Sequence, residues 1–186
     1  MSAAVELLEG AVSNSNRRGR FIVTYTGIRF WPLDPRPEEI LIEDIAHSLS
    51  MQCRFNGHIE SFYSVADHCV RVSAECADEN KLCGLLHDAS EAYLCDIPTP
   101  LKKELPDYMK YERQLQSMIY ETFGIKEETE DVKKADKVLL VTEMRDLRLN
   151  AELSSFPYKP LPTVIKPWPQ DFAKQVFLDC FHAWYK

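Results

Sequence analysis

Long hydrophobic stretches and an excess of basic charge are both missing from this sequence. No apolar run approaches the roughly 18 residues that a membrane-spanning helix needs. Lysine and arginine together number 22 against 29 aspartates and glutamates, which gives a net charge of −7. General binders of nucleic-acid polymers or membrane surfaces present a basic patch, so we expect neither kind of partner. One small anionic ligand stays compatible with this balance, because it needs only a local cation or metal.

Cysteine pairs of the metal-binding or redox type are missing as well. No C-x-x-C occurs among the six cysteines, which are Cys53, Cys69, Cys76, Cys83, Cys95 and Cys180. Most of them lie in apolar stretches with helical spacing. The sequence shows no basic segment followed by an apolar one, which is the pattern of a secretory signal. We therefore expect reduced core cysteines in a cytoplasmic protein.

The chain also has no internal repeat and no low-complexity tract. Its 186 residues suit one domain with a substantial hydrophobic core. Residues 1–20 are small and polar and become basic toward their end. We therefore expect a flexible N-terminal arm over residues 1–20 and a single domain over residues 21–186.

Apolar residues recur mostly at the spacing of an amphipathic helix. Between residues 61 and 76 they form one i, i+3, i+4, i+7 stripe. Comparable patterns predict helices over 42–50, 61–76, 78–88, 108–123, 132–150 and 170–185, with Asp78 as an N-cap and Gly124 as a C-terminal stop. Two β-rich stretches, 21–26 and 28–33, flank Gly27 as in a short hairpin. The predicted fold class is all-α, a helical bundle with a short N-terminal β-hairpin.

Ionisable side chains gather where the 78–88 pattern ends. An apolar run leads directly into His87 and Asp88, Glu91 follows three residues later, and Asp96 stands just before a proline-rich stop. A buried histidine or carboxylate has to be paired or coordinated, because its desolvation alone is costly. An imidazole beside a carboxylate supplies two ligands that divalent transition metals accept.

Two further residues of the same chemistry lie on other apolar helical faces. His68 falls at the edge of the 61–76 stripe, and Asp136 shares a helix side with Val132 and Leu139. Alone, such a histidine is more often a satisfied core residue, and such an aspartate is often a cap or an ion-pair partner. Together with the adjacent His-Asp pair they form a four-ligand set. Two imidazoles and two carboxylates suit Mn, Co, Fe, Ni or Zn better than an all-oxygen Ca or Mg site.

The order H…HD…D on helices resembles the HD-domain phosphohydrolase superfamily. Longer stretches are similar to its bacterial and phage 5′-deoxynucleotidase branch, the YfbR- and YfdR-like proteins. These stretches are F-Y-S-V-A-D-H, H-D-A-S-E-A-Y-L-C-D-I-P-T-P-L-K, V-K-K-A-D and T-E-M-R-D-L. I-E-D-I-A-H-S-L-S and C-R-F-N-G-H look like the YfdR-type subgroup. The resemblance extends from about residue 27 to residue 147 and implies that the helical bundle is an HD domain.

The resemblance implies a role for each matching residue. The metal ligands would be His68, His87, Asp88 and Asp136, holding one divalent transition ion (Co, Mn, Zn, Fe or Ni). Glu91 and Asp96 match the acidic pair that serves the nucleophilic water and the leaving group. Trp31 resembles the aromatic that packs on the sugar and disfavours a ribose 2′-hydroxyl.

Other substrate contacts follow the resemblance less closely. The family has Arg-Trp where this chain has Phe-Trp, so the arginine that contacts phosphate is expected to be Arg29 or Arg54. Thr99 and Lys103 are candidate donors to phosphate, and His58 is a candidate for the pocket mouth. Glu143 is expected to pair with a buried arginine or to orient the residues around Asp136.

The function implied by the resemblance is that of a metal-dependent nucleotide phosphohydrolase. The simplest form is a 5′-deoxynucleotidase that releases phosphate from deoxynucleoside monophosphates by attack of a metal-activated water. The partner would be a small nucleotide, and the self-association common in the family implies a homo-oligomer. Base preference, phosphate number, native metal and bacterial or phage origin stay open.

Three alternatives differ in the residues that they need. A deoxynucleoside triphosphohydrolase needs several cations near its substrate, and a non-catalytic nucleotide sensor does not need Glu91 and Asp96. A diiron oxygenase or cyclic-dinucleotide phosphodiesterase needs additional histidine ligands. The other histidines, His47, His58 and His182, form no paired-histidine motif, which disfavours the third alternative.

Overall fold

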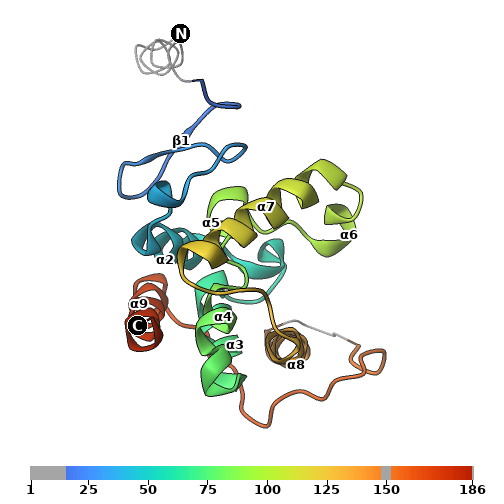
Figure 1. Ribbon diagram of the computed structural model, residues 1–186. Coiled ribbons are helices and arrows are strands. Elements are labelled where there is room, and N and C mark those ends of the chain that lie inside the picture. Colours follow the sequence, from blue (N-terminus) through green and yellow to red (C-terminus); the bar gives the residue numbers. More distant parts are fainter. Residues whose placement is uncertain (1–15, 148–151, 186) are drawn as a thin grey trace.

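The protein is mostly helical, with a short β-hairpin near its N-terminus (Figure 1). The computed structural model describes residues 16–147 and 152–185. Its helices are α2 (Ile42–Met51), α3 (Val65–Glu75), α4 (Lys81–Leu86), α5 (Glu91–Leu94), α6 (Thr99–Lys102), α7 (Pro106–Thr122), α8 (Glu130–Leu147) and α9 (Gln170–Trp184). Short 3₁₀ turns are η1 (Pro37–Glu39), η2 (Arg54–Gly57) and η3 (Asp78–Asn80). Strands β1 (Ile22–Val23) and β2 (Arg29–Phe30) pair antiparallel. The predicted fold class is thereby confirmed.

Helix α3 lies at the centre of the bundle and contacts α2, α4, α8 and α9. The expected start of this helix at residue 61 is wrong, because Ser64 is its N-cap and accepts a hydrogen bond from the N–H of Asp67 at 3.1 Å. Its apolar stripe is buried as predicted, and Val65, Cys69 and Val72 are all 0% exposed. Burying a valine side chain contributes about 1.5–3 kcal/mol, so this stripe anchors α3 between its neighbours.

The helix expected over 78–88 is divided. Asp78 lies inside η3 and pairs with Lys81 at 2.6 Å instead of capping a helix. Helix α4 then ends at Leu86, and residues 87–90 form a turn before α5. The adjacent His87 and Asp88 therefore occupy a turn between two short helices. The proline-rich stretch that was expected only to break the chain carries the short helix α6.

The C-terminal part of the chain covers α3 and α8. Residues 152–169 contain no helix or strand, and α9 packs on α2 and α3. Side chains of α8 hold this irregular segment, since Thr142 accepts from the N–H of Leu161 and Asp146 accepts from the N–H of Ile165. The predicted extension of the 132–150 helix beyond Leu147 lies outside the described residues.

The N-terminal end of the described chain is anchored to the body. Arg17 contacts Asp34 and Glu39 through ion pairs of 2.7 and 2.6 Å, and its guanidinium lies 4.4 Å from the ring centroid of Trp31. The flexible arm expected over 1–20 therefore does not include Arg17, and residues 1–15 lie outside the described part. Within the described ranges, no helix is both long and apolar enough to cross a membrane.

Candidate active site

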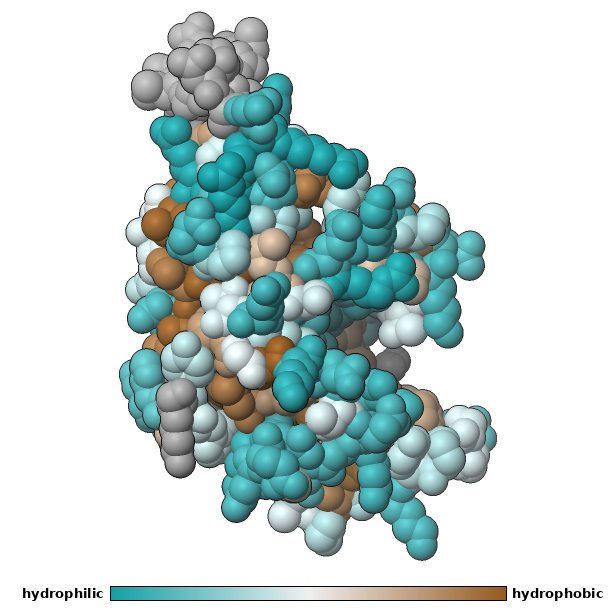
Figure 2. All heavy atoms as spheres, viewed as in Figure 1, coloured by the Kyte–Doolittle hydropathy of each residue, from teal (hydrophilic) through white to brown (hydrophobic). Residues whose placement is uncertain are grey.

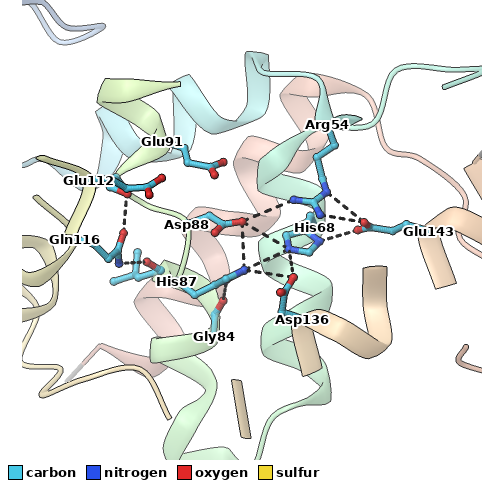
Figure 3. Close-up of polar contacts among 12 residues, drawn as sticks. Arg54, His68, Gly84, His87, Asp88, Glu91, Glu112, Gln116, Asp136 and Glu143 are labelled. Atoms are coloured by element: carbon cyan, nitrogen blue, oxygen red, sulfur yellow. Dashed lines mark hydrogen bonds and ion pairs between the residues drawn. The ribbon is translucent and has the colours of Figure 1, made fainter. Parts of the chain in front are cut away.

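Four metal-ligand side chains from distant parts of the chain converge beside the centre of the bundle (Figure 3). His68 comes from α3, His87 and Asp88 from the turn after α4, and Asp136 from α8. The Nε2 atom of His68 lies 3.3 Å from Nε2 of His87 and 3.3 Å from Oδ1 of Asp136. The Oδ2 atom of Asp88 lies 3.2 Å from Nε2 of His87 and 3.7 Å from Nε2 of His68. Side chains from residues 68 to 136 of the chain thus meet at one point.

These separations fit a single metal ion. Nitrogen and oxygen ligands lie about 2.0–2.2 Å from a zinc-like ion, so neighbouring ligand atoms in a tetrahedral site are about 3.4 Å apart. His68, His87 and Asp136 each place a ligand atom within 4.8 Å of the other two. Asp88 is not a member of this group of three, but its Oδ2 atom approaches both imidazoles. The two carboxylates therefore approach the imidazole pair from different sides.

Both histidines are fixed in the orientation that a metal ligand needs. Nδ1 of His68 lies 2.6 Å from Oε1 of Glu143, and Nδ1 of His87 lies 2.8 Å from the carbonyl of Gly84. An acceptor at Nδ1 keeps the proton there and leaves the lone pair on Nε2 for a metal. Both Nε2 atoms face the common point, so the tautomers suit coordination.

A buried ion pair between Arg54 and Glu143 contacts His68 on the side away from the cluster. Glu143 on α8 is 0% exposed and accepts from Nε and Nη2 of Arg54 at 3.2 and 3.1 Å. Burial acts to raise the pKa of Glu143, but Arg54 and His68 hold the net pKa below its usual value. Glu143 is therefore a charged acceptor that holds the imidazole of His68 in place, and the sequence pointed to this role.

Charges within the cluster also shift the titration of the adjacent pair. Burial acts to lower the pKa of His87, yet the carboxylate of Asp88 beside it raises the net pKa well above the usual value. Burial acts to raise the pKa of Asp88, and His87 outweighs this and lowers it. Protons therefore compete with a metal for this pair, as at other histidine–carboxylate sites.

Glu91 lies next to the cluster with half of its carboxylate unpartnered. The residue is only 5% exposed, and its Oε2 atom is buried without a hydrogen-bond partner among the described residues. Its Oε1 atom lies 3.7 Å from Nζ of Lys102. Burial, followed by the charges of Asp88 and Asp96, raises the pKa of Glu91 well above its usual value. A carboxylate in this state is suited to exchanging a proton near neutral pH.

A cavity of about 570 Å³ opens onto these residues. Its walls come from η2, the segment 96–98, α6 and α8, and its lining includes Asp88, Glu91, Asp96 and Asp136. Figure 2 shows the surface hollowed between the lobe of α6 and α7 and the part formed by α8 and the segment after it. The volume is in the range of small-molecule sites, so a ligand of nucleotide size has access to the cluster.

The structure brings some of the predicted substrate contacts to this cavity and leaves others away from it. Arg54, His58 and Thr99 line it. Lys103 is exposed at the end of α6 and does not line the cavity. Trp31 and Arg29 are also absent from the lining, and both contact Phe21 near the hairpin. Trp31, Arg29 and Lys103 therefore do not line this cavity, and their assignment to the substrate stays a prediction.

Two residues that the sequence interpretation did not name also line the cavity. Lys102 lines the cavity because successive residues of a short helix point in different directions. Phe55 lines the cavity next to Arg54, whose guanidinium lies 5.5 Å from the ring centroid of Phe55. Phe55 and Asn56 have φ values of 54° and 53°, a left-handed turn in which asparagine is common and phenylalanine is rare. The quoted motif C-R-F-N-G-H was the available signal.

A cysteine offers a different ligand set at the same place. Cys69, His87 and Asp88 also have ligand atoms within 4.8 Å of one another. Burial raises the pKa of the Cys69 thiol to about 11, so the thiol is protonated at neutral pH without a metal. Thiolate is the metal-binding form of cysteine, and the set with Asp136 therefore provides the better ligands.

Fold and site define a helical protein with histidine and carboxylate groups positioned to bind a metal ion. No family model matches the chain. The chain is 45% identical over 131 residues to the "Uncharacterized protein YfdR" of Escherichia coli strain K12, a match that covers 70% of this chain and 74% of YfdR. It is 37% identical over 110 residues to an uncharacterized protein of Rhodobacter capsulatus, covering 54% of this chain and 56% of that protein. The chain therefore belongs to the YfdR-like proteins.

Proposed function

We propose that this protein is an HD-domain phosphohydrolase that removes phosphate from deoxynucleoside monophosphates with one divalent transition metal. The observation that carries the proposal is the meeting of two imidazoles and two carboxylates at the floor of a cavity, beside the unpartnered Oε2 of Glu91. When bound there, a divalent ion would neutralise phosphate oxygens and make a water molecule more acidic. The residues of the chain supply the remaining functions.

Glu91 is the proposed proton acceptor. Glu91 lines the cavity and its Oε2 has no hydrogen-bond partner among the described residues, so its lone pairs are available to the attacking water, and its raised pKa suits proton transfer near neutrality. Asp96 lines the same cavity and matches the second member of the acidic pair. We assign Asp96 to the leaving group: the proton that Glu91 takes from the attacking water is passed on through Asp96 to the 5′-oxygen of the nucleoside as it departs, so the proton transfer balances.

Cations at the cavity favour a single phosphate. In the described part of the cavity lining, the permanent cations are Arg54 and Lys102. Arg54 is already engaged by Glu143, and Lys102 is bonded to Glu112 at 2.6 Å. A triphosphate carries more charge than this pair neutralises, so the monophosphate is the preferred substrate over the triphosphate alternative.

The sugar specificity is assigned to Phe55. Its ring lines the cavity on the side of η2, and an aromatic face packs well on the apolar face of a deoxyribose. A ribose 2′-hydroxyl placed against an aromatic ring loses its hydrogen bonds to water, which costs free energy. Deoxynucleotides should therefore be preferred over ribonucleotides.

A nucleotide panel tests the proposal. The metal-loaded protein is incubated with deoxy- and ribonucleotides at each phosphorylation level, with Co²⁺, Mn²⁺ or Zn²⁺, and phosphate, pyrophosphate and triphosphate are separated as products. We expect phosphate from deoxynucleoside monophosphates. Release of triphosphate would support the triphosphohydrolase instead, and binding of nucleotides without any product would support a sensor.

A further inference from the structure

The turn that carries His87 and Asp88 is held open by a side chain from α7. In a continuous α-helix the N–H of Ser90 would donate to the carbonyl of Leu86, four residues earlier. Here the amide of Gln116 stands between these two groups. Its Nε2 donates to Leu86 O at 2.7 Å, and its Oε1 accepts from the N–H of Ser90 at 2.9 Å. One side chain therefore replaces one backbone hydrogen bond of the helix.

The remaining backbone bonds show the consequence. The N–H groups of Ala89 and Glu91 donate to carbonyls three residues earlier, at 3.1 and 3.0 Å. Bonds of this type tighten the chain into a 3₁₀-like turn, and a side chain inserted into a helical ladder is a recognised cause of a kink. The interruption lies between α4 and α5, at the residues that carry the metal-ligand groups.

The change to 3₁₀-like bonding at this point accompanies the convergence of two adjacent side chains. Adjacent residues on an α-helix point about 100° apart and do not face each other. His87 and Asp88 are adjacent, yet their Nε2 and Oδ2 atoms lie 3.2 Å apart at the common point of the cluster. Figure 3 shows Gln116 beside this turn, with Asp136 and Glu143 on the other side of the cluster.

A second glutamine makes a similar bridge further along the same segment. Nε2 of Gln52 donates to the carbonyl of Glu91 at 2.9 Å, and its Oε1 accepts from the N–H of Asp96 at 3.2 Å. Gln52 therefore holds the part of the segment that carries the acidic pair, and its side-chain hydrogen bonds in the described structure go to Ser48, Glu91 and Asp96 and not to the turn of His87. It provides an internal comparison for Gln116.

We propose that Gln116 is a positioning residue for the metal site, because its amide opens the helix at His87 and Asp88 and so aims both side chains at one ion. The inference rests on the metal-binding part of the proposed function. Neither His87 nor Asp88 is contacted by the Gln116 side chain directly. Its effect passes through the backbone groups of Leu86 and Ser90, both of which are buried.

Metal affinity of the full chain, measured by calorimetric titration with Co²⁺, Mn²⁺ and Zn²⁺, tests this inference. Gln116→Leu removes both bridging bonds, and Gln116→Glu keeps an acceptor for Ser90 but cannot donate to Leu86 when ionised. We expect each variant to bind metal about 10–100-fold more weakly, the loss usual when a group that orients a metal ligand is removed. The visible absorption of the Co²⁺ form should also change, since it reports ligand geometry.

Matched variants separate positioning from general destabilisation. Gln114→Leu changes an exposed glutamine of the same helix, and Gln52→Leu removes the comparable bridge, so both should keep metal affinity within about threefold of wild type. The thermal midpoints of the metal-free proteins are recorded alongside. If Gln116→Leu does not fold, Gln116→Glu decides the question.

Two results would overturn the inference. One is wild-type metal affinity and an unchanged Co²⁺ spectrum in a folded Gln116 variant, and the other is an equal loss of affinity in Gln52→Leu. Absence of phosphate release from every nucleotide by the wild-type protein would instead refute the proposed hydrolase. The metal affinities would still decide the role of Gln116 in that case, so the two failures are distinguishable.

Discussion

In the proposed function, substitution of Glu91 should separate metal binding from turnover. Its side chain is buried beside the cluster, its Oε2 has no partner among the described residues, and it is not one of the proposed ligands. Glu91→Gln keeps the size of the side chain and removes its ability to accept a proton. Loss of a general base lowers turnover by about 10²–10⁴-fold.

We therefore expect Glu91→Gln to lose at least a hundredfold in kcat on deoxynucleoside monophosphates, about the lower limit for a general base. Its metal affinity should stay close to that of wild type. Glu104→Gln changes an exposed carboxylate of the neighbouring segment and serves as the control. A metal-loaded Glu91→Gln protein with wild-type kcat would contradict the assignment of the base.

The candidate metal ligands could be predicted from the sequence because of their residue types and positions. His68 and Asp136 are ionisable groups on apolar helix faces, and such groups have few options other than pairing or coordination. The substrate contacts lacked this constraint. Phe55 lines the cavity through a left-handed turn that Asn56 and Gly57 favour, but a turn signal does not show which side chain faces a cavity.

Helix ends determine how the segment of residues 87–96 presents its carboxylates. Cys95 ends α5 with φ 68° and ψ 153°, a backbone conformation that is essentially restricted to glycine. The N–H of Cys95 donates to the carbonyl of Glu91 at 2.9 Å, and its own carbonyl accepts from the hydroxyl of Tyr108 at 2.6 Å. These bonds keep a strained residue between Glu91 and Asp96.

Glycine at this position should relieve the strain. A residue held in this region costs about 1–3 kcal/mol, so Cys95→Gly is expected to raise the midpoint of thermal unfolding. Cys95→Ser removes the thiol but keeps a Cβ atom, and it should give no such gain. Equal stabilisation by both variants would show that the thiol, and not the backbone, is responsible.

The irregular segment after α8 depends on a carboxylate. Asp146 is 6% exposed at its side chain and accepts hydrogen bonds from Arg145 and from the N–H of Ile165. The hydrogen bond from Arg145 lowers the pKa of Asp146 below its usual value of 3.8, with burial acting in the opposite direction. Because the folded-state pKa is the lower one, the ionised carboxylate stabilises the fold above the unfolded-state pKa. This contribution is lost as the pH falls through the folded-state pKa.

Asp146→Asn should therefore destabilise the protein at neutral pH by about 1–3 kcal/mol, the range for hydrogen bonds to charged groups. The difference from wild type should shrink as the pH falls below 3.8. Denaturant unfolding at a series of pH values measures this, with Asp179→Asn on an exposed part of α9 as the control. A difference that stays constant down to acidic pH would rule out ionisation of Asp146 as the cause.

Element boundaries explain where prediction of the fold succeeded and where it failed. Long periodic segments such as α7, α8 and α9 were predicted nearly at their observed bounds, because many apolar positions define each face. The division of the 78–88 helix was not predicted. We attribute the interruption after Leu86, between α4 and α5, to Gln116, which lies 30 residues beyond Leu86 in the chain and 26 beyond Ser90. A contact between remote segments leaves no trace in local periodicity.

The whole molecule works as a scaffold that brings remote helices to one cavity. The central helix α3 supplies His68 and packs on both α4 and α8, so the helices that carry the other ligands are its direct neighbours. Helix α7 reaches the same region through Gln116, and η2 contributes Arg54. Sequence periodicity predicted these helices, but only their packing shows that the ligand atoms meet.

Metal content of the purified protein tests the central claim most directly. Wild type and His87→Ala are dialysed with excess Mn²⁺, Co²⁺ or Zn²⁺, then against metal-free buffer, and their bound metal is quantified by elemental mass spectrometry. The proposed cluster predicts a single tightly bound ion per wild-type chain and loss of most of that ion in a folded His87→Ala protein. No retained metal in wild type, or equal retention in both proteins, would contradict a metal site built from His68, His87, Asp88 and Asp136.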